Sequence, residues 1–224
     1  MDMYSQKSPS YAQKALLVLF ELCLIALSWY LMFGGGLPGA GLTGAATELQ
    51  LWTVFIFNCV VFLRMIFTMF LFVERRIPFE EAISVPFAFA LYYIGFAVLA
   101  YLSSGQSTIL YFTGILLFLV GSVFNSLSEW QRYLFKKDPS NAGHLYTGGL
   151  FRYSMHINYF GDLLWVAGYA CVTANPYSVL IVIFLFSFFW FFNIPKLDEH
   201  LASRYGQAFQ DYARHTKRLI PFVL

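Results

Sequence analysis

Long apolar runs restrict the architectures open to this 224-residue chain. Six of them approach the roughly 20 residues that an α-helix needs to cross the hydrocarbon core of a bilayer; they cover residues 15–33, 49–73, 82–102, 109–125, 159–174 and 177–193. Only 12% of the residues are charged, about half of the roughly 25% that is typical of soluble domains. We therefore predict an all-α integral membrane protein with six transmembrane helices.

The basic residues predict the orientation of these helices. All 14 Lys and Arg lie at the N-terminus, near the end of the second helix, between the fourth and fifth helices, or after the sixth. The links after the first, third and fifth helices contain none. Because basic loops stay on the cytoplasmic side, we expect a multi-pass protein with both termini in the cytoplasm. The N-terminal residues do not read as a secretory signal peptide.

A few polar or reactive residues lie within the apolar runs. Cys23, Cys59 and Cys171 have no paired spacing, so we expect packing residues without a disulfide or a metal site. Charges within a membrane are rare and normally face a partner inside the bundle. Glu21 and Arg64 are therefore predicted to pair, either as a structural ion pair or as part of the lining of a substrate cavity.

Glu80 and Glu81 open the third predicted helix. A carboxylate is stabilised by the dipole at a helix N-terminus, so one interpretation is a solvated surface pair. The other is that one of them points into the mouth of the bundle and donates a proton.

A polar segment joins the fourth and fifth helices. Asn125, Glu129, Arg132 and Lys136 recur at spacings of four, three and four, which places them on one face of a helix that continues beyond the membrane. Asp138–Pro139 should end this helix. The sequence therefore predicts a polar helical face directly before the fifth span.

The stretch GGLFRYSMHINYFGDLLW, residues 148–165, brings Arg152, His156, Asn158, Tyr159 and Asp162 to the start of the fifth helix. Cationic side chains suit phosphate or carboxylate groups, and amide and phenol groups suit ribose and base edges. A basic patch against anionic lipid would account for the cations, but not for Asn158 or Asp162. We therefore predict a site for a large anionic or zwitterionic cofactor.

The C-terminal residues predict an amphipathic helix on the cytoplasmic membrane surface. Its apolar residues repeat every four positions, at Leu197, Leu201, Tyr205 and Phe209. Gly206 is a candidate break. We expect this tail to close over the cofactor, with Arg204, Tyr205 and Arg218 as contacts.

Several of these segments together resemble the steroid 5α-reductase superfamily. They are QRYLFKKDPSNAG, GLFRYSMHINYFGD, DEHLASRYGQAF and LIPF, and the likeness covers residues 120–224. The isoprenylcysteine and phospholipid methyltransferases are more distant relatives on the same helical core. The reductase pattern of Asn, an aromatic residue, Phe or Leu, Gly and a carboxylate is matched by residues 158–162, with Asp162 in place of the usual Glu. The His-Pro-x-Tyr pattern of the methyltransferases lacks its Pro here, because Ile157 follows His156.

The resemblance implies NADPH as cofactor, with S-adenosylmethionine as the alternative. Asn125, Glu129, Lys136, Asn158, Asp162 and Tyr205 fall on positions that hold NADPH in the reductases. The full set of candidate cofactor residues is Asn125, Glu129, Arg132, Lys136, Asn141, Arg152, His156, Asn158, Tyr159, Asp162, Arg204, Tyr205 and Arg218. An acidic residue near Asp198–Glu199 helps to bind the adenosyl cofactor in the methyltransferases.

The resemblance also implies a catalytic pair, which in the steroid reductases is a Gln-Glu dipeptide with a downstream Tyr. The pair is matched loosely, by Glu80 and Glu81 with Tyr92 or Tyr93. We therefore predict an NADPH-dependent reductase of an activated C=C bond in a lipid or steroid-like substrate. The alternatives are an S-adenosylmethionine-dependent methyltransferase and a non-catalytic membrane scaffold.

We predict one membrane domain over residues 1–224. Residues 1–107 would contain the first three helices and face the substrate, and residues 108–224 would form the cofactor-binding half. The expected partners are a lipid-soluble small molecule and membrane lipid, with no nucleic acid. The sequence leaves the substrate and the oligomeric state open.

Overall fold

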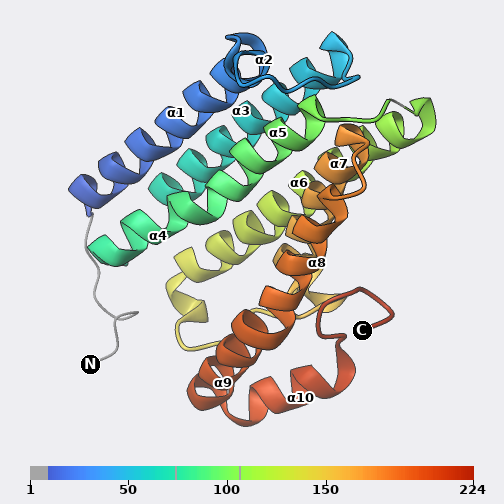
Figure 1. Cartoon of the computed structure of the whole chain (residues 1–224). Helices are drawn as coiled ribbons and strands as arrows, with labels where there is room; N and C mark the ends of the chain where they lie inside the picture. The colour runs from blue at the N-terminus through green and yellow to red at the C-terminus, as the bar shows by residue number, and fades with distance from the viewer. Residues whose placement is uncertain (1–9, 74, 106) are drawn as a thin grey trace. The chain divides into compact units, whose positions relative to one another are not determined.

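The computed structural model describes residues 10–73, 75–105 and 107–224 (Figure 1). Lys7, one of the basic residues behind the predicted orientation, lies outside these ranges. The regular structure in the described residues is helical, apart from isolated bridge positions such as the parallel bridge between Ser154 and Lys217. In chain order the helices are α1 Tyr11–Phe33, α2 Gly36–Gly39, α3 Glu48–Leu71, α4 Phe79–Ala90, η1 Leu91–Gly95, α5 Phe96–Tyr101, α6 Thr108–Lys137, η2 Pro139–Asn141, η3 Gly149–Arg152, α7 Ile157–Thr173, α8 Ser178–Phe188, η4 Phe189–Asn193, α9 Ile194–Tyr205 and α10 Gln207–His215.

Five helices within the described residues are long and apolar enough to cross a membrane. They are Tyr11–Phe33, Glu48–Leu71, Phe79–Tyr101, Thr108–Lys137 and Ser178–Tyr205. Their outer surfaces expose large apolar side chains such as Leu63, Phe87 and Ile109, as expected for contact with lipid. The chain is therefore an integral, multi-pass membrane protein. The remaining predicted span, residues 159–174, corresponds to α7, whose 17 residues fall short of the roughly 20 that a perpendicular crossing needs.

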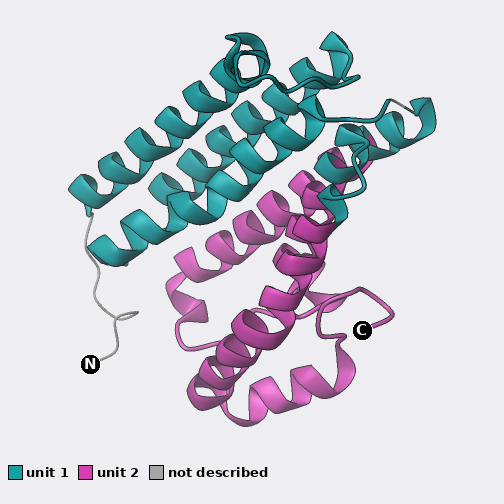
Figure 2. Cartoon of the chain, in the orientation of Figure 1, with its two compact units in different colours: residues 1–115, 169–179 teal, residues 116–168, 180–224 magenta. Residues whose placement is uncertain are grey.

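The chain divides into two compact units (Figure 2). Unit 1 contains Met1–Ile115 and Tyr169–Val179, and unit 2 contains Leu116–Gly168 and Leu180–Leu224. Helix α6 begins in unit 1 and continues in unit 2, while α7 begins in unit 2 and ends in unit 1.

In unit 1, the cytoplasmic ends predicted for the first two spans are fastened together by polar contacts. The Lys14 ammonium donates to the carbonyl oxygen of Val73 at 2.9 Å, just beyond the end of α3, where unpaired carbonyl groups favour a cation. The Ser10 hydroxyl accepts from the Ile77 backbone N–H at 3.0 Å. Beside these bonds lies an apolar cluster of Leu17, Met65, Met69 and Ile77.

Helix α6 runs without a break through 30 residues, which confirms the predicted continuation of the fourth span. It ends at Lys137, directly before Asp138–Pro139. The Asp138 carboxylate accepts from the Ser140 backbone N–H at 2.9 Å and from the Ser140 hydroxyl at 2.8 Å. These two hydrogen bonds lower the pKa of Asp138, and they fix the turn into η2.

The C-terminal part differs from the prediction in one respect and agrees in another. The sequence predicts an amphipathic tail helix on the membrane surface, whereas its first part, α9, continues α8 and η4 as one helix over Ser178–Tyr205. Pro195 is tolerated because it lies at the start of α9, immediately after the π-helical turn η4. The break at Gly206 is confirmed: its φ of 52° is a left-handed conformation that favours glycine, and α10 begins at the next residue.

Unit 2 depends on a close approach of α6 and α7 at two glycines. A Cβ atom on Gly161 would lie 2.6 Å from the backbone nitrogen of Asn125 and 2.8 Å from the carbonyl oxygen of Gly121. A Cβ atom on Gly121 would lie 2.4 Å from the backbone nitrogen of Trp165. Because these neighbours are backbone atoms, a methyl group at either position would force the two helices apart.

We therefore expect Gly161→Ala to destabilise the protein. Overpacking of this kind costs about 1–3 kcal/mol, which should appear as a lower midpoint of thermal unfolding in detergent. Gly39→Ala is the matched control, because no atom lies within 4 Å of a Cβ at Gly39. Equal midpoints for the two variants would contradict the proposed close contact.

Candidate functional site

The approach of α6 to α7 brings Asn125 and Asp162 into direct contact. The Asn125 side-chain amide donates to the Asp162 carboxylate at 2.8 Å and to the carbonyl oxygen of Asn158 at 3.3 Å. The Trp165 indole N–H donates to the same Asp162 oxygen at 2.7 Å. Asp162 is thus held from both helices of the pair, by Asn125 on α6 and by Trp165, three residues further along α7.

Asn158 makes a second link between the two helices, one turn away. Its side-chain amide donates to Glu129 at 3.0 Å, and Arg132 forms an ion pair with the other Glu129 oxygen. Lys136 lies within electrostatic range of Glu129, Arg132 and Arg204. Asn158 is only 8% exposed, so its amide is shielded from water, whereas Lys136 beside this group of charges is exposed.

His156 connects α7 to the C-terminal residues. The imidazole is 1% exposed, and its Nε2 atom lies 2.8 Å from a carboxylate oxygen of Asp198 on α9. The Arg218 guanidinium donates to the other Asp198 oxygen at 2.9 Å, and it lies over the Trp190 ring. Asp198 was not among the predicted cofactor residues; its acidic motif in the sequence was the only signal for it.

The C-terminal segment pairs with the residues before α7. The backbone N–H groups of Met155 and His156 donate to the carbonyl oxygens of Lys217 and Arg218, at 2.8 and 3.1 Å. The Ser154 hydroxyl donates to the Leu219 carbonyl oxygen at 2.7 Å. These bonds fix residues 217–219 of the tail to the start of α7.

Helix α10 is joined to the same region. Tyr212 donates its hydroxyl to the carbonyl oxygen of Phe151 at 2.5 Å. Burial raises the pKa of Tyr212, which keeps this hydroxyl protonated as a donor.

Aromatic rings form a stack along the start of α7. The rings of His156 and Tyr159 are nearly parallel, with centroids 5.6 Å apart, and Tyr159 stacks on Phe189 at 4.5 Å.

The predicted cofactor residues Asn141, Arg152 and Tyr205 make contacts that lie outside both the linked pairs and this aromatic stack. Asn141 donates to the carbonyl oxygen of Phe135, the Arg152 guanidinium packs on the Tyr153 ring, and Tyr205 lies beneath Arg204.

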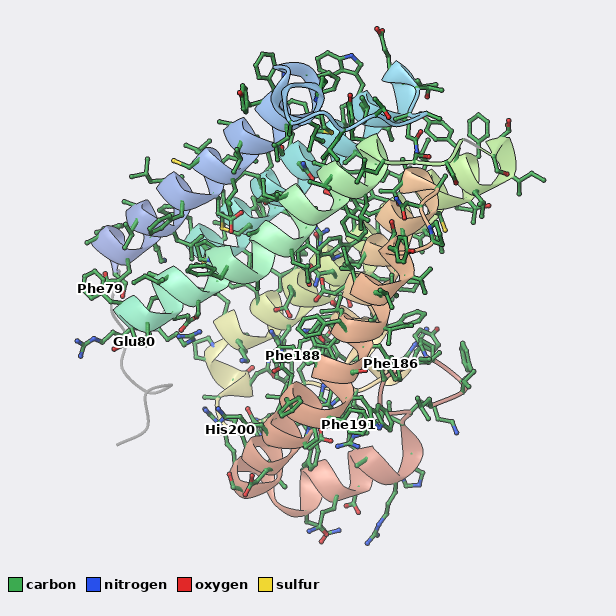
Figure 3. The ribbon with its side chains drawn as sticks, viewed as in Figure 1. Phe79, Glu80, Phe186, Phe188, Phe191 and His200 are labelled. Atoms are coloured by element: carbon green, nitrogen blue, oxygen red, sulfur yellow. The ribbon has the colours of Figure 1, made fainter. Side chains whose placement is uncertain are left out.

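In unit 1, the predicted acids are not near the predicted phenols. Glu81 is held by two hydrogen bonds from Arg75, at 2.7 and 2.5 Å. Glu80 is exposed at the start of α4 (Figure 3). Twelve helical residues separate Glu81 from Tyr93, roughly 18 Å at 1.5 Å per residue. The expected pairing of Glu80 or Glu81 with Tyr92 or Tyr93 is therefore not formed.

Tyr93 instead lies beside Glu21, inside unit 1. Both side chains are 0% exposed, and they lie within electrostatic range of each other. The two groups are hydrogen-bonding neighbours, but neither Glu21 oxygen nor the Tyr93 hydroxyl makes a hydrogen bond of normal geometry among the described residues. The predicted ion pair of Glu21 with Arg64 is likewise not formed in this part of the chain; Arg64 lies within electrostatic range of Tyr169.

The backbone around Tyr93 departs from α-helical geometry. Residues Leu91–Gly95 form the π-helical turn η1, and such turns are frequent at functional sites. Asn58 supports this turn: its amide lies 3.5 Å from the Tyr93 carbonyl oxygen and 3.2 Å from the Ser28 hydroxyl. The Tyr169 hydroxyl donates to the Asn58 carbonyl oxygen at 2.9 Å. Asn58 is thus satisfied, whereas the Glu21 and Tyr93 groups beside it are not.

A family model described as "Protein of unknown function (DUF1295)" matches residues 81–216, which is more than half of the chain. The chain belongs to the DUF1295 family. The match includes η1 with Tyr93 as well as the helices that carry Asn125, Asn158 and Asp162.

Three relatives illustrate what the chain is similar to. The 3-oxo-5-alpha-steroid 4-dehydrogenase 1 of Rattus norvegicus is 32% identical over 51% of this chain and 42% of its own length. The 3-oxo-5-alpha-steroid 4-dehydrogenase 2 of Homo sapiens is 29% identical over 49% of this chain and 41% of its own length. The probable O-methyltransferase ustE of Ustilaginoidea virens is 38% identical over 41% of this chain and 33% of its own length.

These findings confirm the predicted resemblance to the steroid 5α-reductase superfamily. The chain spans less than half of the length of each of these relatives. Their names therefore describe those proteins, and they support the family of this chain without defining its reaction.

Proposed function

We propose that the protein is an NADPH-dependent reductase of an activated C=C bond in a lipid-soluble substrate. One observation carries this proposal: the two linked pairs Asn125–Asp162 and Asn158–Glu129 lie on the motif that resembles the reductases. The likeness to the 3-oxo-5-alpha-steroid 4-dehydrogenases supports the same class of reaction.

The groups in unit 2 fit a phosphorylated nicotinamide dinucleotide. The amides of Asn125 and Asn158 can donate and accept hydrogen bonds at once, which suits a carboxamide or a ribose. Arg132, Lys136 and Arg204 supply positive charge for phosphate oxygens. NADPH, when bound, supplies a hydride for the electron-poor carbon of the substrate. The residues of unit 2 would hold and orient it.

In unit 1, we propose that Tyr93 and Glu21 bind the polar end of the substrate. Burying an ionised carboxylate without a partner is costly, so we infer that Glu21 carries a proton. Its carboxyl group and the Tyr93 hydroxyl would then both donate to one carbonyl oxygen of the substrate and polarise it. Glu21 thereby takes the role predicted for Glu80 or Glu81, while Tyr93 keeps the role predicted for it.

We expect Glu21→Gln and Tyr93→Phe to lower kcat/KM for an enone substrate by about a hundredfold or more, as for other positioned acids. The NADPH dissociation constant should change less than twofold, because neither residue is among those proposed to hold NADPH. Glu80→Gln is the matched control and should retain activity. Loss of activity in Glu80→Gln with full activity in Glu21→Gln would contradict the assignment of Glu21 and would indicate Glu80 as the acid.

The likeness to a probable O-methyltransferase makes S-adenosylmethionine the second candidate cofactor. Thermal unfolding of the purified protein should be titrated with each cofactor, since specific binding raises the midpoint by mass action. We expect NADPH to stabilise the protein. Asn158→Ala should weaken NADPH binding at least tenfold, about 1.4 kcal/mol, relative to the midpoint of the variant alone. Stabilisation by S-adenosylmethionine alone would favour a methyltransferase, and no effect of either would favour a non-catalytic scaffold.

We further propose six spans, with α7 as the fifth in the membrane and both termini in the cytoplasm. The one-sided distribution of Lys and Arg supports this arrangement, and it allows the substrate to enter laterally from the bilayer. A reporter fused after Leu224 should be cytoplasmic, and a reporter inserted in residues 174–177 should be external. An external C-terminal reporter would contradict an even number of spans.

A further inference from the structure

A cavity of about 450 Å³ lies in unit 2 beside the C-terminal segment. Met155, Asp198 and Phe209 line it together with residues 213–218. Neither of the linked pairs that support the proposed function, Asn125–Asp162 and Asn158–Glu129, lines this cavity. The cavity thus adjoins the His156–Asp198–Arg218 contacts but does not include the linked pairs.

Positive charge exceeds negative charge in this cavity. Three basic residues, Arg214, Lys217 and Arg218, and one carboxylate, Asp198, line it. Arg214 also forms an ion pair with Asp211, which does not line the cavity. The two Asp198 oxygens already contact Arg218 and His156, so the negative charge of Asp198 is compensated before a ligand arrives.

Donors remain for a ligand. Arg218 uses its Nε atom for Asp198, and a guanidinium carries two further NH₂ groups. Lys217 is exposed, and no hydrogen bond or ion pair joins its ammonium to another residue in the described part of the chain. Thr216 is half-buried, lines the cavity and contributes a hydroxyl group. In the chain it lies between the end of α10 and Lys217.

The backbone that carries these donors is held in place. The carbonyl oxygens of Lys217 and Arg218 accept from Met155 and His156, and Asp198 orients the guanidinium. Little ordering is left to occur on binding, which favours affinity. The C-terminal end of α10 carries a partial negative charge that disfavours a bound anion. The basic residues Arg214 and His215 in its last turn offset that effect.

We propose that this cavity binds a phosphate group through Lys217, Arg218 and Thr216. An ammonium and a guanidinium with free N–H groups, together with a hydroxyl, are the donors that a phosphate monoester prefers. The phosphate would belong to a nucleotide, to the headgroup of an anionic lipid, or to free phosphate. The same donors would bind the phosphate group in each case, and the experiment below distinguishes the three molecules that could carry it.

The full-length protein in detergent should be titrated with inorganic phosphate and with adenosine 2′-phosphate, and thermal unfolding followed; adenosine is the uncharged comparison. A second arm measures binding of the protein to neutral lipid vesicles with and without phosphatidic acid. Lys217→Gln and Thr216→Val test the site, and Lys196→Gln is the control, since Lys196 is exposed but does not line the cavity.

We expect at least one phosphate probe to bind, with Lys217→Gln weakening it at least tenfold and Lys196→Gln less than twofold. Preference for adenosine 2′-phosphate would identify a nucleotide, and preference for phosphatidic acid a lipid headgroup. No binding of any probe, or equal weakening by Lys217→Gln and Lys196→Gln, would overturn the proposal. Adenosine 2′-phosphate is also a fragment of NADPH, so its binding alone does not locate the site. Weakening by Lys217→Gln assigns the binding to this cavity, because Lys217 lines it and is not among the residues proposed to hold NADPH.

Discussion

The site in unit 2 depends on the contact between Gly121 on α6 and Gly161 on α7. Small residues let two helix backbones approach closely within a membrane, and here the missing side chains leave room for backbone atoms that a Cβ would meet at 2.4–2.8 Å. At this separation the Asn125 amide reaches both Asp162 and the carbonyl oxygen of Asn158. The glycine within the NYFGD motif therefore allows a short distance between α6 and α7, which brings the neighbouring polar residues within hydrogen-bonding reach of α6.

A second constraint follows from the scarcity of water inside a helical bundle. Buried polar groups are normally hydrogen-bonded, and Asn58 in unit 1 obeys this rule, because its side chain both donates and accepts a hydrogen bond. The side-chain oxygen of Gln50 is an exception among the described residues. Glu21 and Tyr93 depart from it together. Two unsatisfied groups side by side, next to a π-helical turn, are costly to maintain unless a ligand completes them. For this reason we assign them to the substrate.

In unit 2, the C-terminal segment joins α9 to the residues at the start of α7. Residues 217–219 pair with the backbone before α7, and Asp198 on α9 meets both His156 and Arg218. Residues separated by more than 40 positions are thereby held within hydrogen-bonding distance. A substitution that breaks these bonds would consequently disturb cofactor contacts on the tail and on α7 together. The tail therefore helps to shape the site, in addition to the role on the membrane surface that the sequence predicts for it.

The sequence by itself determined the class of the protein and much of its local structure. The apolar runs predicted helices and the membrane, Asp138–Pro139 predicted the end of α6, and Gly206 predicted the break in the tail, because each signal depends on neighbours along the chain. The spacing of Asn158 and Asp162 likewise predicted a shared face. Tertiary structure alone decided which acid lies beside Tyr93 and which carboxylate holds His156. Glu21 and Tyr93 are 72 positions apart, and Asp198 lies 42 positions from His156, so these pairs depend on how whole helices pack, which no local pattern specifies.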